Sequence, residues 1–167
     1  MSKDFLIIGF SKAKGFKPLS WLIMLEQNTK FSHAYIKLSN KHFGDFDIYQ
    51  ASKGLVNHVI DSTFLEENEV VQEFVIPIDT ASKLEIIANI RKKLGRPYSV
   101  RALLGIFLYQ RLNIEIKWLF DGDKAYICSE LVARVLDSSG KISLDIDLDK
   151  ATPKQLYSFC ETNFDKN

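Results

Sequence analysis

The amino-acid sequence predicts an α+β fold in which an antiparallel β-sheet packs against several helices. The first half of the chain contains short runs of β-branched and aromatic residues separated by turn residues, a pattern typical of strands. In the second half the apolar residues recur with the period of a helix. Strands followed by helices favour the α+β class. With 167 residues the chain can bury one core, so we expect a single domain over residues 1–167.

The strands are expected in the first half of the chain, at residues 5–10, 33–38, 47–51, 55–60 and 70–78. The turn residues between these runs favour a meandering antiparallel sheet. A helix over residues 18–27 is expected between the first two strands, because Pro18 suits the first turn of a helix.

The second half of the chain is expected to begin with a helix over residues 82–94. Leu84, Ile87, Ile90 and Leu94 are expected on one apolar face of this helix, and Gly95 is well placed to end it. Further helices are expected at residues 100–112, at residues 126–136, and after Thr152, a residue type that caps helices.

The charge of the chain is balanced, with 22 Lys and Arg residues against 21 Asp and Glu residues. A protein that binds phosphate backbones normally carries an excess of basic residues gathered on one face. We therefore expect no nucleic-acid partner.

The two cysteines, Cys128 and Cys160, are too few for a disulfide scaffold, and we expect free thiols in a reducing compartment. The apolar run at residues 5–10 is brief and lacks the cleavage site of a signal peptide. The longest apolar stretches, residues 19–25 and 102–109, are too short to span a bilayer. These features favour a cytoplasmic protein and leave contact with a membrane surface open.

The first candidate for chemistry is Cys128, at the start of a strongly amphipathic helix. The N-terminus of a helix carries partial positive charge and unpaired backbone N–H groups, which stabilise a thiolate and bind an oxyanion. This position predicts a lowered pKa for the Cys128 thiol. The alternative is that Cys128 fills apolar space in the core, as lone cysteines often do.

The second candidate is His33, at the beginning of the expected strand 33–38. A strand holds an imidazole rigidly, and a nucleophile and its base need only be neighbours in space. The other histidines, His42 in a turn-like segment and His58 in a strand, have no recognisable partner. The spacing of the His and Cys residues matches no metal site, so neither a metal nor another cofactor is expected.

Five segments of the chain resemble, in the same order, the circularly permuted branch of the NlpC-type papain-like cysteine hydrolases. This group includes the YiiX-like proteins and is related to lecithin:retinol acyltransferase. The resemblance extends over about residues 30–160, and its most specific elements are Ser-His at the start of a strand and the later Cys-Ser-Glu-Leu-Val on a helix. Histidine before cysteine is the reverse of ordinary papain order. The matching segments are residues 32–38, 48–56, 95–99, 126–132 and 151–156.

The resemblance implies a permuted papain-like fold and a role for several side chains. Cys128 matches the family nucleophile and His33 its general base. Gln50 stands at the third position, where it would orient His33, although many permuted members have an acid there. Tyr98, in Gly-Arg-Pro-Tyr, matches a tyrosine that would donate to an oxyanion, and packing at a helix start is the alternative. Glu130 matches a signature position, and favourable interaction with the helix dipole is its alternative.

These residues predict a cysteine-dependent hydrolase or acyltransferase that acts on an amide or ester bond through an acyl-enzyme. The resemblance implies cell-wall peptides, other amides or lipids as substrate classes. The alternative is a catalytically weak or inactive papain-like module that binds a lipid, a peptide or a partner protein, and neutral Gln50 favours it. A third hypothesis, an acyl carrier at a membrane surface, rests on Phe107, Leu108 and Trp118.

Overall fold

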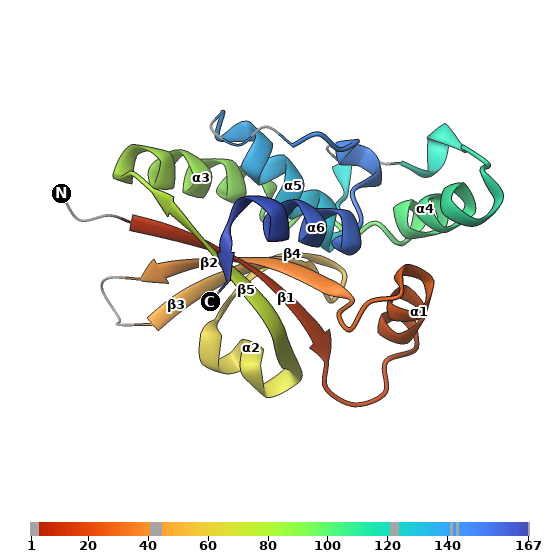
Figure 1. The fold of residues 1–167 in the computed structure, drawn as a ribbon, viewed down its shortest axis with the longest axis horizontal. Coiled ribbons are helices and arrows are strands. Elements are labelled where there is room, and N and C mark those ends of the chain that lie inside the picture. The colour runs from red at the N-terminus through yellow and green to blue at the C-terminus, as the bar shows by residue number, and fades with distance from the viewer. Residues whose placement is uncertain (1–3, 41–44, 121–123, 141, 143, 167) are drawn as a thin grey trace.

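A twisted antiparallel sheet lies at the centre of the structure, a computed structural model that describes residues 4–40, 45–120, 124–140, 142 and 144–166 (Figure 1). Within these residues the sheet has six strands in the order β4-β3-β2-β1-β5-β6. The strands are β1 (Asp4–Ala13), β2 (His33–Asn40), β3 (Asp45–Ser52), β4 (Leu55–Ile60), β5 (Asn68–Ile78) and β6 (Asp165–Lys166).

The helices divide between the two faces and one end of the sheet. Helices α3, α5 and α6 cover one face, α2 lies on the other, and α1 and α4 lie together beyond one end (Figure 1). The helices are α1 (Pro18–Gln27), α2 (Asp61–Glu67), α3 (Thr80–Lys93), α4 (Val100–Leu112), α5 (Cys128–Ser138) and α6 (Pro153–Asn163), with short 3-10 helices η1 (Lys117–Leu119) and η3 (Leu148–Lys150).

The structure confirms the α+β class and the antiparallel sheet. Helices α1 and α4 have the bounds that the sequence predicts, and the expected helix at residues 126–136 begins two residues later, at Cys128. The apolar face expected on α3 is only partly correct: Ile87 and Ile90 pack on the core, but Leu84 and Leu94 are exposed and Ile86 is buried instead. The sequence did not predict α2 or β6. Helix α2 spans only seven residues and buries one of them, Phe64, so it has too few turns to show a helical period.

The main hydrophobic core lies between the sheet and helices α3, α5 and α6. Helix α5 is its most deeply buried helix, since every residue from Cys128 to Ala133 is buried. Leu131, Val132 and Val135 of this helix pack against apolar side chains of the strands, including Ala34 of β2. This packing holds the first turn of α5 against the beginning of β2.

The opposite face of the sheet carries a smaller cluster formed by Tyr35, Ile48 and Phe64. Gly9 of β1 pairs directly with Tyr35 of β2, and the Tyr35 ring covers it so closely that an added Cβ would lie 2.0 Å from a ring carbon. The ring is held in place because its hydroxyl donates a 2.8 Å hydrogen bond to Glu73. Gly9 is therefore required by close packing.

Replacement of this glycine, Gly9→Ala, should lower the free energy of unfolding by about 2 kcal/mol, because the methyl group must displace a fixed ring. In a strand without such a contact, alanine would be at least as stable as glycine. Chemical denaturation of Gly9→Ala, Tyr35→Leu and the double variant measures the coupling. We expect Gly9→Ala to cost much less in the Tyr35→Leu background. An equal cost in both backgrounds would show that the ring does not limit residue 9.

Candidate active site

Residues 95–99, which contain the Gly-Arg-Pro-Tyr motif, lie between strand β4 and the residues just before α5 and are hydrogen-bonded to both. We call this segment the strap. Backbone hydrogen bonds join the strap to Gly54 and Val56 on one side, and to Tyr126 on the other, with lengths of 2.8 to 3.0 Å. Gly95 has φ +77°, a conformation that glycine adopts without strain. The strap places Tyr98 beside the N-terminus of α5.

Cys128 is the first residue of α5, and its sulfur lies against the backbone on both sides of His33. The Sγ atom is 4.0 Å from the carbonyl oxygen of Ser32 and accepts a hydrogen bond from the N–H of Ala34. The side chain is only 3% exposed. The packing of α5 on β2 therefore brings the thiol to the residues that flank the histidine.

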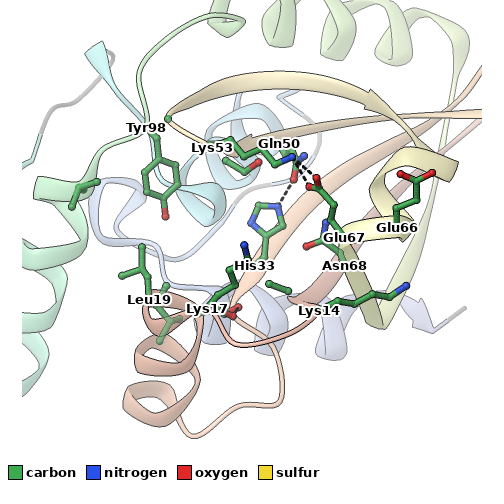
Figure 2. A pocket seen from close by; sticks show the side chains of 18 residues that line it. Lys14, Lys17, Leu19, His33, Gln50, Lys53, Glu66, Glu67, Asn68 and Tyr98 are labelled. Carbon is green, nitrogen blue, oxygen red and sulfur yellow. Dashed lines mark hydrogen bonds and ion pairs between the residues drawn. The ribbon is translucent and has the colours of Figure 1, made fainter.

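His33 is the first residue of β2, and its ring is fixed by Gln50 of the neighbouring strand β3. The Nε2 atom of His33 lies 2.7 Å from Oε1 of Gln50 (Figure 2). An amide oxygen can only accept, so Nε2–H is the donor and Nδ1 of the neutral ring is left without a proton. This tautomer offers Nδ1 as a proton acceptor.

Burial sets the protonation of both groups. It lowers the pKa of His33 to about 4, and the hydrogen bond to Gln50 opposes this shift only in part, although the ring keeps some exposure to solvent. Burial also raises the pKa of the Cys128 thiol, against the opposing effect of backbone N–H groups at Ala34 and Ser129. At neutral pH both groups are therefore uncharged.

The expectation of a lowered Cys128 pKa is thus wrong for this structure. The helix N-terminus is present, and the N–H groups near the sulfur do favour the thiolate. The cost of removing a charged sulfur from water is larger, because Cys128 is almost completely buried. The sequence shows that a helix begins at Cys128 but does not show how deeply that residue is buried.

Tyr98 is partly buried beside Cys128. Burial, and then the negative charge that a Cys128 thiolate would carry, raise the pKa of the Tyr98 phenol well above its usual range. The hydroxyl therefore stays protonated and can donate a hydrogen bond.

An open cleft of about 720 Å³ lies at this end of the sheet. His33, Gln50 and Tyr98 all contribute to its wall (Figure 2). Apolar side chains from α1 and the start of α4, together with charged residues at the end of α2, form other parts of the wall. Cys128 is not among the residues that line the cleft, so its sulfur lies behind the wall.

Glu130 fixes the first turn of α5 from a different side. Its carboxylate is buried and accepts a 2.9 Å hydrogen bond from Arg134, which also pairs with Asp149 of η3. Burial raises the pKa of Glu130 to about 7, and the interaction with Arg134 opposes this shift. Ser129 adds a 2.6 Å hydrogen bond from its hydroxyl to the carbonyl oxygen of Ala151.

The sequence did not indicate these supporting contacts. The spacing of Glu130 and Arg134, four residues apart on a helix, is a signal that could have indicated their ion pair. The partners of Ser129 and Arg134 in and after η3 could not be found in this way, because they come from a separate segment of the chain.

The remaining His and Cys residues lie apart from this site. His58 has a partner that the sequence did not reveal, since its Nε2 lies 2.8 Å from Asp47. Cys160 is fully buried in α6, and burial raises the pKa of its thiol to about 12. His42 lies outside the described residues.

Among the residues that are described, no three His, Cys, Asp or Glu side chains gather where they could hold a metal ion.

Comparison with known proteins gives a match of fold. No family model matches the chain, and no curated protein does. A solved structure, that of the metalloprotein yiiX from Escherichia coli O157:H7, is similar with a TM-score of 0.65 over 99% of this chain and 96% of that one. The two sequences are 12% identical. The match shows that the chain has the fold of yiiX, as the resemblance to YiiX-like proteins implied.

The yiiX structure is described as a metalloprotein. The described part of the present chain does not fit a metal centre, since His33 is bonded to neutral Gln50 and no group of three ligating side chains surrounds it.

The lowered pKa of His33 predicts a pH dependence of stability. Unfolded histidine takes up a proton near pH 6.5, whereas His33 in the fold resists protonation until about pH 4. Between these values the unfolded chain binds more protons, so the free energy of unfolding should fall as the pH falls. His33→Gln removes this contribution, which is at most about 1.4 kcal/mol per pH unit. Urea unfolding of both proteins at several values from pH 4 to 7 measures the difference, and parallel curves would contradict a buried neutral imidazole.

Proposed function

We propose that this chain is a cysteine-dependent hydrolase or acyltransferase acting on an amide or ester carbonyl, with Cys128 as nucleophile and His33 as base. The observation that carries the proposal is the hydrogen bond from His33 to Gln50. It leaves Nδ1 as a proton acceptor on a residue whose two neighbours in the chain contact the Cys128 sulfur.

The reaction begins from an uncharged pair. The thiol proton of Cys128 passes to Nδ1 of His33 as the sulfur bonds to the substrate carbonyl carbon, and the carbonyl oxygen becomes an oxyanion. The protonated Tyr98 hydroxyl and the backbone N–H of Cys128 are donors for that oxyanion. The intermediate then collapses, the leaving group takes the proton from His33, and a thioester with Cys128 results.

The second half of the cycle releases the acyl group. His33 removes a proton from water or another acceptor, whose oxygen or nitrogen bonds to the thioester carbon while the bond to sulfur breaks. The proton returns to Cys128. Gln50 orients the imidazole throughout, but as a neutral amide it adds no negative charge to stabilise the imidazolium.

Access to the sulfur is the main requirement of this mechanism. Cys128 lies behind the cleft wall, so a substrate in the cleft reaches it only when Ser32 or Tyr98, which contribute to that wall, moves aside. A buried and uncharged thiol should react slowly with small electrophiles until such a movement occurs.

The rival function is a papain-like module that binds a ligand in the cleft without turnover. The buried thiol, its raised pKa and the neutral Gln50 favour this rival. The two functions differ in whether a covalent acyl group ever forms on Cys128, and one experiment separates them.

Incubation with the activated ester p-nitrophenyl butyrate should acylate Cys128 and release nitrophenol. Cys128→Ala should lower the rate by roughly a thousandfold or more, because the nucleophile is lost. Cys160→Ala is the matched control, since it removes the other thiol, and it should keep the rate. Intact-protein and peptide mass spectrometry locate the butyryl group. A wild-type protein that forms no butyryl adduct and releases nitrophenol no faster than Cys128→Ala would favour the binding module.

Substitution of Gln50 tests its part as a positioning residue. Gln50→Leu should lower the esterase rate by about tenfold, because the imidazole loses the partner that fixes its tautomer. Gln50→Glu should keep or raise the rate, and a carboxylate at this position should also raise the pKa of His33. Nuclear magnetic resonance of the imidazole nitrogens reports both tautomer and pKa. Equal rates and an unchanged His33 spectrum in all three proteins would remove Gln50 from the site.

A further inference from the structure

Helix α1 exposes apolar side chains over most of its surface. Leu19, Trp21, Leu22 and Leu25 are all exposed, with Trp21 at 50% and Leu25 at 67%. Of the residues of α1, all of which the structure describes, only Gln27 is buried. A surface helix normally turns polar side chains toward water, so an exposed apolar helix indicates a surface that something apolar covers.

Helix α4 continues this surface. Val100, Leu104 and Phe107 form an exposed stripe at helical spacing, while Ala102 and Ile106 pack inward. The two helices lie side by side at one end of the molecule (Figure 1). An ion pair of 2.6 Å between Glu26 of α1 and Arg111 of α4 joins them. We call the exposed apolar residues of α1 and α4 together the apolar end.

The apolar end is continuous with the cleft. Leu19 and Ile23 of α1 and Val100 of α4 line the cleft wall, together with Tyr98. Figure 2 shows Leu19 of α1 and Lys17, the residue before this helix, on the same side of the cleft. Whatever covers the apolar end therefore lies at the mouth of the cleft.

The chain segments that carry the apolar end are more basic than the chain as a whole. Residues 14–30 and 98–118 contain six Lys and Arg residues against two acidic ones, whereas the whole chain has 22 against 21. Both acidic residues are ion-paired, Glu26 with Arg111 and Glu115 with Lys150. This charge complements an anionic surface. In a symmetric dimer the same positive face would oppose itself, which disfavours a second copy as the occupant.

Exposed aromatic residues next to lysines also favour an anionic partner surface. Phe16 and Trp118 are strongly exposed. Lys17 follows Phe16 in the chain, and Lys117 precedes Trp118. The Phe16 ring also lies 6.3 Å from that of Trp21. Aromatic and aliphatic side chains flanked by lysine are the composition of helices that lie in the interface of an anionic membrane.

We infer that the apolar end docks on an anionic lipid bilayer, with α1 and α4 lying in the interface and the mouth of the cleft facing the lipid. The docking is peripheral, because no helix within the described residues has both the length and the apolar character to cross a bilayer. This inference does not depend on turnover at Cys128.

Co-sedimentation with lipid vesicles tests the inference. The full chain should bind vesicles containing about 30 mol% phosphatidylserine and bind pure phosphatidylcholine roughly tenfold more weakly. The double variant Trp21→Gln, Leu25→Gln should lose roughly tenfold or more of its binding, because two large apolar side chains no longer enter the interface. Leu84→Gln, which changes an equally exposed leucine on α3, is the matched control and should bind like wild type.

The charge is tested by Lys17→Gln combined with Lys117→Gln, which should lower binding to the anionic vesicles by roughly fivefold or more. Unchanged melting temperatures show that the variants are folded. Cys128→Ala should bind vesicles normally, so docking and catalysis can fail separately. Two results would overturn the inference: no binding to anionic vesicles, or a dimer in analytical ultracentrifugation that Trp21→Gln, Leu25→Gln dissociates, which would make a second copy the occupant.

Discussion

The candidate site depends on one contact, the packing of the first turn of α5 against the beginning of β2. The Cys128 sulfur touches the backbone at Ser32 and Ala34, residues far away along the chain. Three other attachments support this turn: the backbone bonds of the strap to Tyr126, the Ser129 hydroxyl bonded to Ala151, and the pairing of Glu130 with Arg134. Loosening any of them would move the thiol relative to His33.

Burial has two opposite consequences at this contact. It fixes the positions of Cys128 and His33, and it also keeps both uncharged by raising the pKa of the thiol and lowering that of the imidazole. The Cys128 thiol and the His33 imidazole are therefore both held in their neutral, less reactive forms. The proposed chemistry requires that proton transfer from Cys128 to His33 and access of the substrate to the sulfur occur together.

Helix α1 links the cleft to the apolar end. The hydroxyl of Ser20 lies 2.5 Å from that of Ser32, whose carbonyl oxygen contacts the Cys128 sulfur, and the outer side of the same helix carries Trp21 and Leu25. A membrane that covered the outer side would therefore contact the same helix that contributes to the cleft wall in front of the Cys128 sulfur. This arrangement connects the proposed docking with the access that the proposed chemistry needs.

The sequence by itself determined the α+β class, the bounds of α1 and α4, and the start of a helix near Cys128, because these follow from local periodicity, proline and turn residues. The resemblance also singled out His33 and Gln50, which the structure joins by a hydrogen bond. Only the tertiary structure decided how deeply Cys128 is buried, and with it the direction of its pKa. Cys128 is buried because α5 packs against the beginning of β2, and the residues in contact, Ser32 and Cys128, are 96 positions apart in the chain. A local sequence pattern cannot indicate how deeply such a long-range contact buries a residue.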